Sequence, residues 1–573
     1  MVVFSELYRQ SNGLCAWSPS GDLVAVAVGH RVVVRDGDTM KISQLFTAND
    51  ELQMIQWSPD GEYVMAASYK KGVVNVWSIR DEDWQATVTE GVGGVCHVMW
   101  APDSRHVLTT ADFRIYTSVW SLMVNDEDEP ESKARGRSGA RKNKKKTPKG
   151  ADAGKCVGHI LNPKGPNTTD FDASGRWLAV ATREQCKDRL EIYHAGDGDW
   201  SLAHHFGLST HDAANVAWSP RSRFVCVLDC PLQYLVLVFS PDGTLLRRFQ
   251  PYKDALGVRS VRWDPSGQFL SIGSFDDRLR VLSHMTWKAF ADFSHEASLK
   301  RRRKPLVFCE VVADLDESET RFGVIAEVGA VGESKAGRDI AAKERKKKEE
   351  DSDKGTSSSR GAGVRRQRKK TTAAARRSTI ISKRRAPTSR HYSRESDNRK
   401  AIAKTADGFE FVATKYVLAD ITDVDAEATP LRSILPDPKK GNPKMGVAKQ
   451  EWSRCGRFVA TVSSRTPRIV WIWAPHCMSL CAILKQQMPV RSISWDPARP
   501  RLAICVGAPK IFFWTPKGAS WTDVPAEAFG VLRALWRPSG GGSAILAVGK
   551  SKICSLSLDI AASEGEGAGV GEE

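Results

Sequence analysis

One short phrase recurs along this chain and limits the folds that it can adopt. The phrase is a tryptophan, then a small or acidic residue, then proline, and often a glycine two residues after the proline, as in Trp17-Ser-Pro-Ser-Gly21. Apolar runs lie on both sides of each copy, and a β-branched run follows 18–22 residues later. Such runs separated by proline and glycine indicate strands joined by turns. Clear copies stand at Trp17, Trp57, Trp100, Trp218, Trp263, Trp495 and Trp536, and weaker copies at Phe171 and Trp452.

Adjacent copies begin 40 to 47 residues apart wherever no insert separates them, which is the period of a four-stranded propeller blade. A single blade cannot bury both of its faces, whereas blades stacked around an axis cover each other. The nine copies therefore predict an all-β WD-repeat propeller, either one ring of nine blades or a seven-blade ring with two additional blade-like units. We expect the eight tryptophans of the phrase to pack between blades, because large aromatics at a fixed register are typical of buried sheet contacts.

The two ends of the repeat region indicate how the ring closes. The last unit, Val531–Leu558, has three strand-like runs and then changes to a tail rich in glycine and glutamate. We expect the N-terminal run Val2–Tyr8 to supply the missing outer strand, since an open sheet edge invites pairing with other chains. The alternative is that these residues only cap an edge.

Two inserts interrupt the repeat and hold the positive charge. The chain has a formal net charge of +17, but residues 332–405 alone contain 24 Lys/Arg against 9 Asp/Glu, and residues 124–155 contain 10 against 6. The remaining residues are therefore close to neutral, near −2. Low hydrophobicity and blocks of like charge predict disorder in both inserts. Around the second insert, Leu306–Val312 and Phe409–Val417 look like paired strands, and Arg321–Val328 like a further short strand.

The predicted organisation follows from these boundaries. It is blades one to three in 1–123, a disordered insert in 124–155, blades four to six with extra strands in 156–331, a disordered insert in 332–405, an extra strand and blades seven to nine in 406–560, and a disordered tail in 561–573.

Three interpretations of the basic inserts stay open. They are solvated segments without a dedicated partner, or they dock on an acidic polymer such as a microtubule surface or RNA through counterion release. The third interpretation is nuclear import through Arg141–Lys146 or Lys383–Arg385. The side chains that would contact a polyanion are Lys144, Lys145, Lys146, Arg365, Arg366, Lys369 and Lys370.

No motif in the sequence indicates catalysis, and we expect no enzyme activity, cofactor or metal site. There is no Gly-x-x-x-x-Gly-Lys-Ser/Thr loop, no Gly-x-Ser-x-Gly elbow and no His-Glu-x-x-His pair. The 12 cysteines form no Cys-x-x-Cys pair, and Cys226 and Cys505 are expected to act as small core residues in a reducing cytosol. His204 and the next residue would face opposite ways in a strand. Asp276 and Asp277 are interpreted as turn-binding rather than catalytic.

Several stretches outside the blade phrase carry a more specific resemblance. They are Phe4-Ser-Glu-Leu, Val33-Val-Arg-Asp36, Tyr69-Lys-Lys-Gly72, Cys186-Lys-Asp188, His284-Met-Thr-Trp-Lys288, Pro443-Lys-Met-Gly446, Pro489-Val-Arg491 and Pro500-Arg-Leu-Ala-Ile-Cys505. In these stretches and their order the chain resembles the WD-repeat protein eight family, also called the WD-repeat protein antisense to a tumour-protein gene. The resemblance covers nearly all of Phe4–Leu558, and the inserts and the tail depart from it.

This resemblance implies a non-catalytic scaffold of the cytoplasm and cytoskeleton, found at centrosomes, spindle poles and basal bodies. It implies a complex with a coiled-coil microtubule-anchoring protein and, in some cells, with a minus-end-directed kinesin. Such a complex would tether microtubule minus ends, organise the spindle and support cilium assembly. The alternative is an RNA-binding or translation-associated propeller, against which the near-neutral blades argue. No run reaches the roughly 18 apolar residues of a membrane helix, so no membrane partner is expected.

Overall fold

The computed structural model places most of the predicted blade segments. It describes residues 2–122, 154–195, 200–295, 305–312, 322–325, 403–404, 410–411, 414–419, 444–526, 529–538 and 543–558. Contacts divide the chain into two units, Met1–Ala326 with Ile402–Glu573, and Glu327–Ala401. All the described residues belong to the first unit. All but four residues of the two inserts and the tail lie outside these ranges, so the disorder predicted for these segments stays a prediction.

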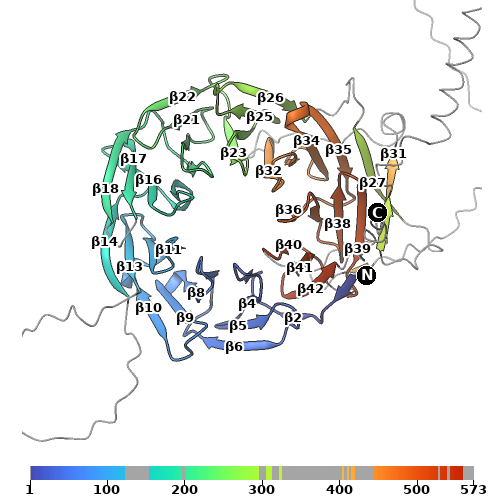
Figure 1. Ribbon diagram of the computed structural model, residues 1–573, viewed down its shortest axis with the longest axis horizontal. Coiled ribbons are helices and arrows are strands. Elements are labelled where there is room, and N and C mark those ends of the chain that lie inside the picture. Colours follow the sequence, from blue (N-terminus) through green and yellow to red (C-terminus); the bar gives the residue numbers. More distant parts are fainter. Residues whose placement is uncertain are drawn as a thin grey trace, which may run out of the picture. The chain divides into compact units, whose positions relative to one another are not determined.

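Within that unit, nine antiparallel sheets follow one another around a ring, each with its first strand innermost (Figure 1). The first three blades are β3 (Cys15–Trp17), β4 (Leu23–Val28), β5 (Arg31–Asp36) and β6 (Ile42–Thr47); β7 (Met54–Trp57), β8 (Tyr63–Ser68), β9 (Val73–Ser78) and β10 (Gln85–Thr89); and β11 (Val95–Trp100), β12 (His106–Ala111), β13 (Tyr116–Ser121) and β14 (Lys155–Leu161). The next three are β15 (Thr169–Phe171), β16 (Trp177–Glu184), β17 (Lys187–His194) and β18 (Ser201–Gly207); β19 (Asn215–Trp218), β20 (Val225–Leu228), β21 (Val236–Phe239) and β22 (Leu245–Phe249); and β23 (Val258–Trp263), β24 (Phe269–Ser274), β25 (Arg278–Ser283) and β26 (Ala289–Ser294).

The last three blades complete the ring. They are β32 (Val447–Trp452), β33 (Val459–Ser463), β34 (Ile469–Ala474) and β35 (Ser479–Lys485); β36 (Ser492–Trp495), β37 (Leu502–Cys505), β38 (Lys510–Thr515) and β39 (Gly518–Asp523); and β40 (Arg533–Trp536), β41 (Ser543–Val548) and β42 (Lys552–Leu558) with β1 (Val2–Phe4). Helical structure in the described residues consists of short 3-10 turns, at Tyr69–Lys71, Gly91–Gly93, Pro166–Thr168 and Pro475–Cys477. None of these turns approaches the length or apolar character that a membrane-crossing helix requires.

The predicted propeller is confirmed, and of its two predicted forms the structure shows the single ring of nine blades. The predicted closure is also confirmed, because β1 pairs antiparallel with β42 from Val2 opposite Leu558 to Phe4 opposite Leu556. The short strand β2 (Tyr8–Arg9) pairs with the other end of β42. The first and last strands of the described chain therefore share one sheet.

In six of the nine copies, the residue after the tryptophan or Phe171 explains why the phrase forms a turn. The Oγ of Ser58 accepts a 2.9 Å hydrogen bond from the backbone N–H of Tyr63, five residues further on. The Oδ1 of Asp264 accepts the equivalent bond from Phe269 at 2.7 Å. A short side chain with an oxygen thus closes the turn between the first two strands of these blades, which is why serine and aspartate are common at this position, although Ala101 and Arg537 occupy it in the third and ninth blades. Gly61 occupies the turn with a φ of +77°, a conformation that favours glycine.

The apolar side chains do not form a single central core but lie in the contacts between neighbouring blades. Nine hydrophobic clusters occur among the described residues, and each joins two consecutive blades, including the ninth and the first. At the closing interface, Trp17 and Val26 of the first blade pack with Leu546, Val548 and Ile553 of the last. Every blade is therefore stabilised by both neighbours, as stacking of sheets that are apolar on two faces requires.

Two blades carry strands beyond the usual four. β27 (Leu306–Val312) lies parallel along the outer edge of β35 and pairs antiparallel with β31 (Thr414–Ala419), which confirms that the segments flanking the second insert are paired strands. β28 (Phe322–Ile325), predicted as a further short strand, pairs with β39 of the eighth blade. The short pair β29 (Ala403–Lys404) and β30 (Glu410–Phe411) lies nearby in the sequence.

One predicted boundary is wrong. The sequence assigned residues after 155 to the fourth blade, but Lys155–Leu161 is β14, the outer strand of the third blade, paired with β13. The first insert therefore lies between the third and fourth strands of one blade and not between two blades. This arrangement could not be predicted, because the charged insert places more than thirty residues between two strands that pair with each other.

Candidate functional site: the tryptophan turns and the two faces of the ring

The tryptophans of the repeated phrase link successive blades by hydrogen bonds. The indole Nε1 of Trp57 donates to the backbone carbonyl of Ala16 at 3.0 Å, and Ala16 directly precedes the equivalent tryptophan of the blade before. The same bond recurs at four further interfaces. It joins Trp17 to Leu535 (3.1 Å), Trp263 to Ala217 (3.3 Å), Trp495 to Glu451 (3.0 Å) and Trp536 to Ser494 (3.0 Å). Each ring also packs in the apolar contact between its blade and a neighbour.

Three interfaces modify this bond. Trp452 donates at 2.9 Å to the hydroxyl of Ser271, which in turn donates at 2.9 Å to the carbonyl of Arg262, so the serine relays the contact. The indole nitrogens of Trp100 and Trp218 are buried without a hydrogen-bond partner among the described residues. In the fourth blade, which precedes that of Trp218, Phe171 takes the place of the tryptophan. At this interface the side chain of Asp170 accepts a 2.7 Å hydrogen bond from the backbone N–H of Trp218.

Aspartates at the opposite end of the blades form a second set of links. Asp229 accepts bonds from the backbone N–H groups of His211 and Asp212, in the connection from the preceding blade. Asp188 receives the side chains of Lys164 (2.7 Å) and Arg183 (2.9 Å). Burial acts to raise the pKa of Asp188, but the hydrogen bonds from Lys164 and from two further donors outweigh it and lower that pKa.

The interpretation of Asp276 and Asp277 as structural residues agrees with their contacts. Asp276 accepts the backbone N–H of Arg278 within its own turn (3.2 Å) and pairs with Arg280 (2.6 Å). Asp277 bonds the next blade instead, through the backbone N–H of Gly446 (3.0 Å), the hydroxyl of Ser463 and the guanidinium of Arg465. Sequence reasoning expected contacts within the turn and did not foresee this bridge to the next blade.

A buried polar chain between the sixth and seventh blades was also missed. His295 Nδ1 lies 2.8 Å from the carbonyl of Asp277, and its Nε2 lies 2.8 Å from the hydroxyl of Thr461. The same hydroxyl accepts a 2.8 Å bond from the indole of Trp473. The third blade has a related arrangement in which Trp120 donates to Thr109 and to the carboxylate of Glu90. The position of His295 directly after an outer strand is the one sequence feature that could have indicated its role. The contact with Thr461 could not be predicted, because the long insert separates the two residues in the sequence.

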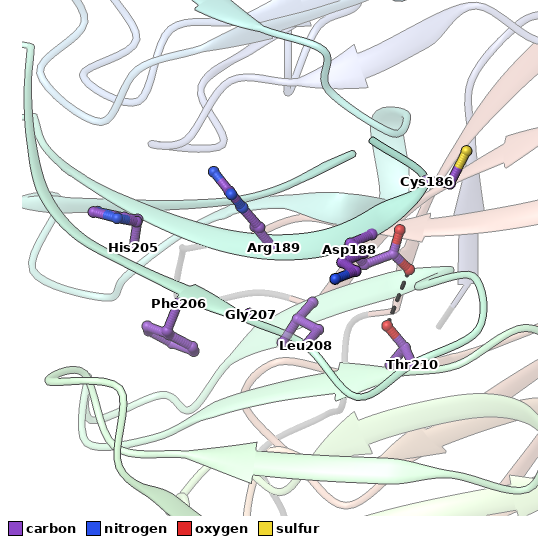
Figure 2. Close-up of a pocket in the computed structure, with 9 residues that line it drawn as sticks. Cys186, Asp188, Arg189, His205, Phe206, Gly207, Leu208 and Thr210 are labelled. Atoms are coloured by element: carbon purple, nitrogen blue, oxygen red, sulfur yellow. Dashed lines mark hydrogen bonds between the residues drawn. The ribbon is translucent and has the colours of Figure 1, made fainter. Parts of the chain in front are cut away.

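A 460 Å³ cavity opens on the outer part of the fourth blade, beside the hairpin between β16 and β17. Figure 2 shows that the hydroxyl of Thr210 meets the carboxylate of Asp188, at 3.0 Å, inside this cavity. Cys186 and His205 lie at opposite ends of the labelled group, and they share no hydrogen bond (Figure 2). The cavity therefore brings a thiol, an imidazole and a carboxylate to one surface without the contacts of a nucleophile and its base.

The remaining candidate chemistry gives no centre in the described residues. No group of three or more histidine, cysteine, aspartate or glutamate side chains there is placed to hold a metal ion. Cys226 and Cys505 are fully buried in strands, and burial raises the pKa of the Cys505 thiol to about 12. His204 and His205 are both in β18. The lysines and arginines proposed for polyanion contact, at 144–146, 365–366 and 369–370, lie outside the described residues.

Comparison with known proteins assigns the chain. Residues 243–283 match the family model described as the WD domain, G-beta repeat. WD repeat-containing protein WRAP73 of Mus musculus is 30% identical over 563 residues, which is 96% of each chain. An uncharacterised WD repeat-containing protein of Schizosaccharomyces pombe is 25% identical over 21% of this chain and 26% of its own length. Among solved structures, the β-propeller domain of Myceliophteria thermophila Cps50 (Swd1) matches 52% of this chain and 90% of that domain at 14% identity, with a TM-score of 0.32. Because the similarity to the mouse protein extends over almost the whole of both sequences, this chain belongs to the WRAP73 family of WD-repeat proteins.

Proposed function

We propose that this protein is a non-catalytic scaffold that works in the cytoplasm at a microtubule-organising centre, such as a centrosome, spindle pole or basal body. There it holds a coiled-coil microtubule-anchoring partner, joined in some cells by a minus-end-directed kinesin. The complex tethers microtubule minus ends, organises the spindle and supports cilium assembly.

The observation that carries this proposal is the 30% identity to mouse WRAP73 over 96% of both chains. A match confined to the blade phrase would support only the fold, since many unrelated functions share one fold. Here the similarity spans 96% of the chain and therefore extends far beyond the blade phrase. The architecture fits the role, because a ring of short sheets presents two broad faces of turns and loops on which partners can bind.

The test is to tag the protein at its native level in cells of its own species and to follow it through mitosis. We expect a focus at each spindle pole, and recovery of a coiled-coil protein when the tagged chain is purified from mitotic extract. The matched control is the same tag on an unrelated propeller. Diffuse localisation through mitosis together with the absence of a coiled-coil partner would contradict the proposal. Recovery of RNA that is lost when residues 332–405 are deleted would favour the RNA-binding alternative.

A further inference from the structure

The face of the ring that carries the tryptophan–proline turns has an uneven charge. In the first three blades these turns expose the carboxylates of Asp22, Asp60 and Asp103, and the third blade also exposes Arg105. In the fourth to eighth blades the exposed charged side chains at the same turns, or directly before the tryptophan in the case of Arg262, are arginines. They are Arg176, Arg221, Arg223, Arg262, Arg454, Arg457 and Arg499. The tryptophan–proline turns therefore form a basic arc on this face, within which the exposed Asp242 of the fifth blade is an acidic side chain from a neighbouring turn.

The arginines of this arc are not used in ion pairs within the described part of the chain. The arginine ion pairs found there lie at other positions, such as Arg501 with the buried Asp496 and Arg537 with Asp38. Burial raises the pKa of the Glu451 carboxyl and the nearby Arg262 offsets part of that rise, but Arg262 and Glu451 do not form an ion pair. Unpaired guanidinium groups on a rigid surface are suited to bidentate binding of carboxylates from a partner.

A 520 Å³ cavity opens within this basic arc, at the inner ends of the fifth to eighth blades. Its apolar lining comes from the repeated phrase itself, and its polar lining comes from Arg262, Arg454, Glu451 and Ser494. The apolar residues are Pro220, Trp263, Pro265, Trp452 and Trp495. An apolar recess with charged groups at its border is the usual form of a site that holds one anchoring side chain of a peptide.

The cavity is better suited to a protein segment than to nucleic acid. Trp452 and Trp495 are each only 9% exposed, and their indole nitrogens already bond to Ser271 and to the carbonyl of Glu451. These rings therefore form walls and do not present open faces on which bases could stack. Glu451 also lines the cavity, and burial raises the pKa of its carboxyl to about 7, which weakens its repulsion of an incoming carboxylate near neutral pH.

We infer that this cavity, here called the tryptophan cavity, binds an acidic peptide segment with one large apolar side chain. The apolar side chain enters between the tryptophans, and carboxylates on either side of it pair with Arg262 and Arg454. The inference rests on the proposed scaffold function, because it assigns to one face of the ring the attachment of a partner. It names the partner by its chemistry, and it can be tested without knowing where the protein works in the cell.

The experiment measures binding of labelled probes to the full-length chain by fluorescence anisotropy. The first probe is a short peptide in which glutamates flank a single central phenylalanine, and the second replaces that phenylalanine with serine at unchanged charge. The third is a single-stranded oligouridylate RNA. Because the inserts are also basic, the serine peptide measures the purely electrostatic background. The variants are Arg262→Glu, Arg454→Glu and their combination, with Arg31→Glu, an exposed arginine at the other end of the first blade's strands, as the matched control.

We expect the phenylalanine peptide to bind at least about tenfold more tightly than the serine peptide, and Arg262→Glu with Arg454→Glu to remove that difference. Arg31→Glu should retain it, and thermal unfolding should show that all variants are folded. Three results would overturn the inference: equal binding of the two peptides, equal effects of the three arginine substitutions, or RNA binding that is tighter than peptide binding and depends on the same two arginines. If peptide binding fails while the tagged protein still reaches the spindle pole with a coiled-coil partner, this inference is wrong and the proposed function stands.

Discussion

The indole Nε1 of Trp17 in the first blade donates a 3.1 Å hydrogen bond to the backbone carbonyl of Leu535 in the ninth, 518 residues away in sequence. The bond has the same form as the links between consecutive blades, so the closing interface resembles the other interfaces of the ring. Arg537 reinforces it by pairing with Asp22 and Asp38 of the first blade. Closure therefore uses both side-chain links and the strand pairing of β1 with β42.

The tryptophan links make a testable contribution to stability. We expect Trp57→Phe to lower the free energy of unfolding by about 1–3 kcal/mol through the hydrogen bond alone, because it leaves the partly buried carbonyl of Ala16 without its donor. Trp218→Phe is the matched control, since it removes a ring of the same size whose Nε1 has no partner among the described residues. Urea unfolding followed by circular dichroism measures both. Equal losses would mean that ring packing, and not the hydrogen bond, sets the effect.

A new disulfide can test the closure. The Oγ of Ser5 lies 3.8 Å from the sulfur of Cys554, although the two residues are 549 apart in sequence. We expect Ser5→Cys to form a disulfide with Cys554 under mild oxidation and to stabilise the ring on the order of 4 kcal/mol, because the bond constrains a very long loop in the unfolded chain. The same variant under reducing conditions is the control, and non-reducing electrophoresis shows whether the bond forms. A bond that forms without raising the melting temperature would contradict the expectation that separation of the first and last strands accompanies unfolding.

The fold could be predicted well from the sequence because one phrase encodes a complete local unit. In most copies its serine or aspartate closes the turn and its tryptophan bonds the preceding blade, so the phrase gives nine blade units, although it does not decide between one ring of nine and a seven-blade ring with two additional units. The polar chain from Asp277 through His295 to Thr461 could not be predicted, because the second insert separates its members by 166 residues. The tryptophan cavity was also hidden, since its walls come from four different blades. Residues that come into contact only because the blades form a ring have no regular spacing in the sequence from which the contact could be predicted.

Asp170 gives the stability a specific pH dependence. Burial raises the pKa of this carboxyl from 3.8 to about 6. Between these values the folded protein retains a proton that the unfolded chain has released, so the contribution of Asp170 to stability is present below about pH 4 and is lost as the pH rises through 6. We therefore expect Asp170→Asn to increase the free energy of unfolding at pH 8 by on the order of 1–3 kcal/mol, and to raise the melting temperature accordingly. At pH 4 the substitution should have little effect on either quantity.

The exposed Asp254 provides the control for that titration. Asp254→Asn removes the same charge at a solvated position, and its effect on melting temperature should not vary in the same way between pH 4 and pH 8. Calorimetric scans of both variants across this range make the comparison. A gain for Asp170→Asn that is the same at every pH would show that the substitution acts through packing rather than through the ionisation of the carboxyl.

The hydroxyl of Thr461 is the central contact between the sixth and seventh blades. It accepts the indole N–H of Trp473 and lies 2.8 Å from His295 Nε2. Thr461 is fully buried, so Thr461→Val keeps the shape of the side chain while it removes a polar partner from both groups. We expect a loss of about 2–4 kcal/mol in the free energy of unfolding, because two buried polar groups lose this hydrogen-bond partner at once. Thr461→Ser, which keeps the hydroxyl and loses one methyl group, should lose about 1 kcal/mol. If serine proves as harmful as valine, the methyl contact rather than the hydrogen-bonded chain joins these two blades, and the link from Asp277 through His295 contributes little.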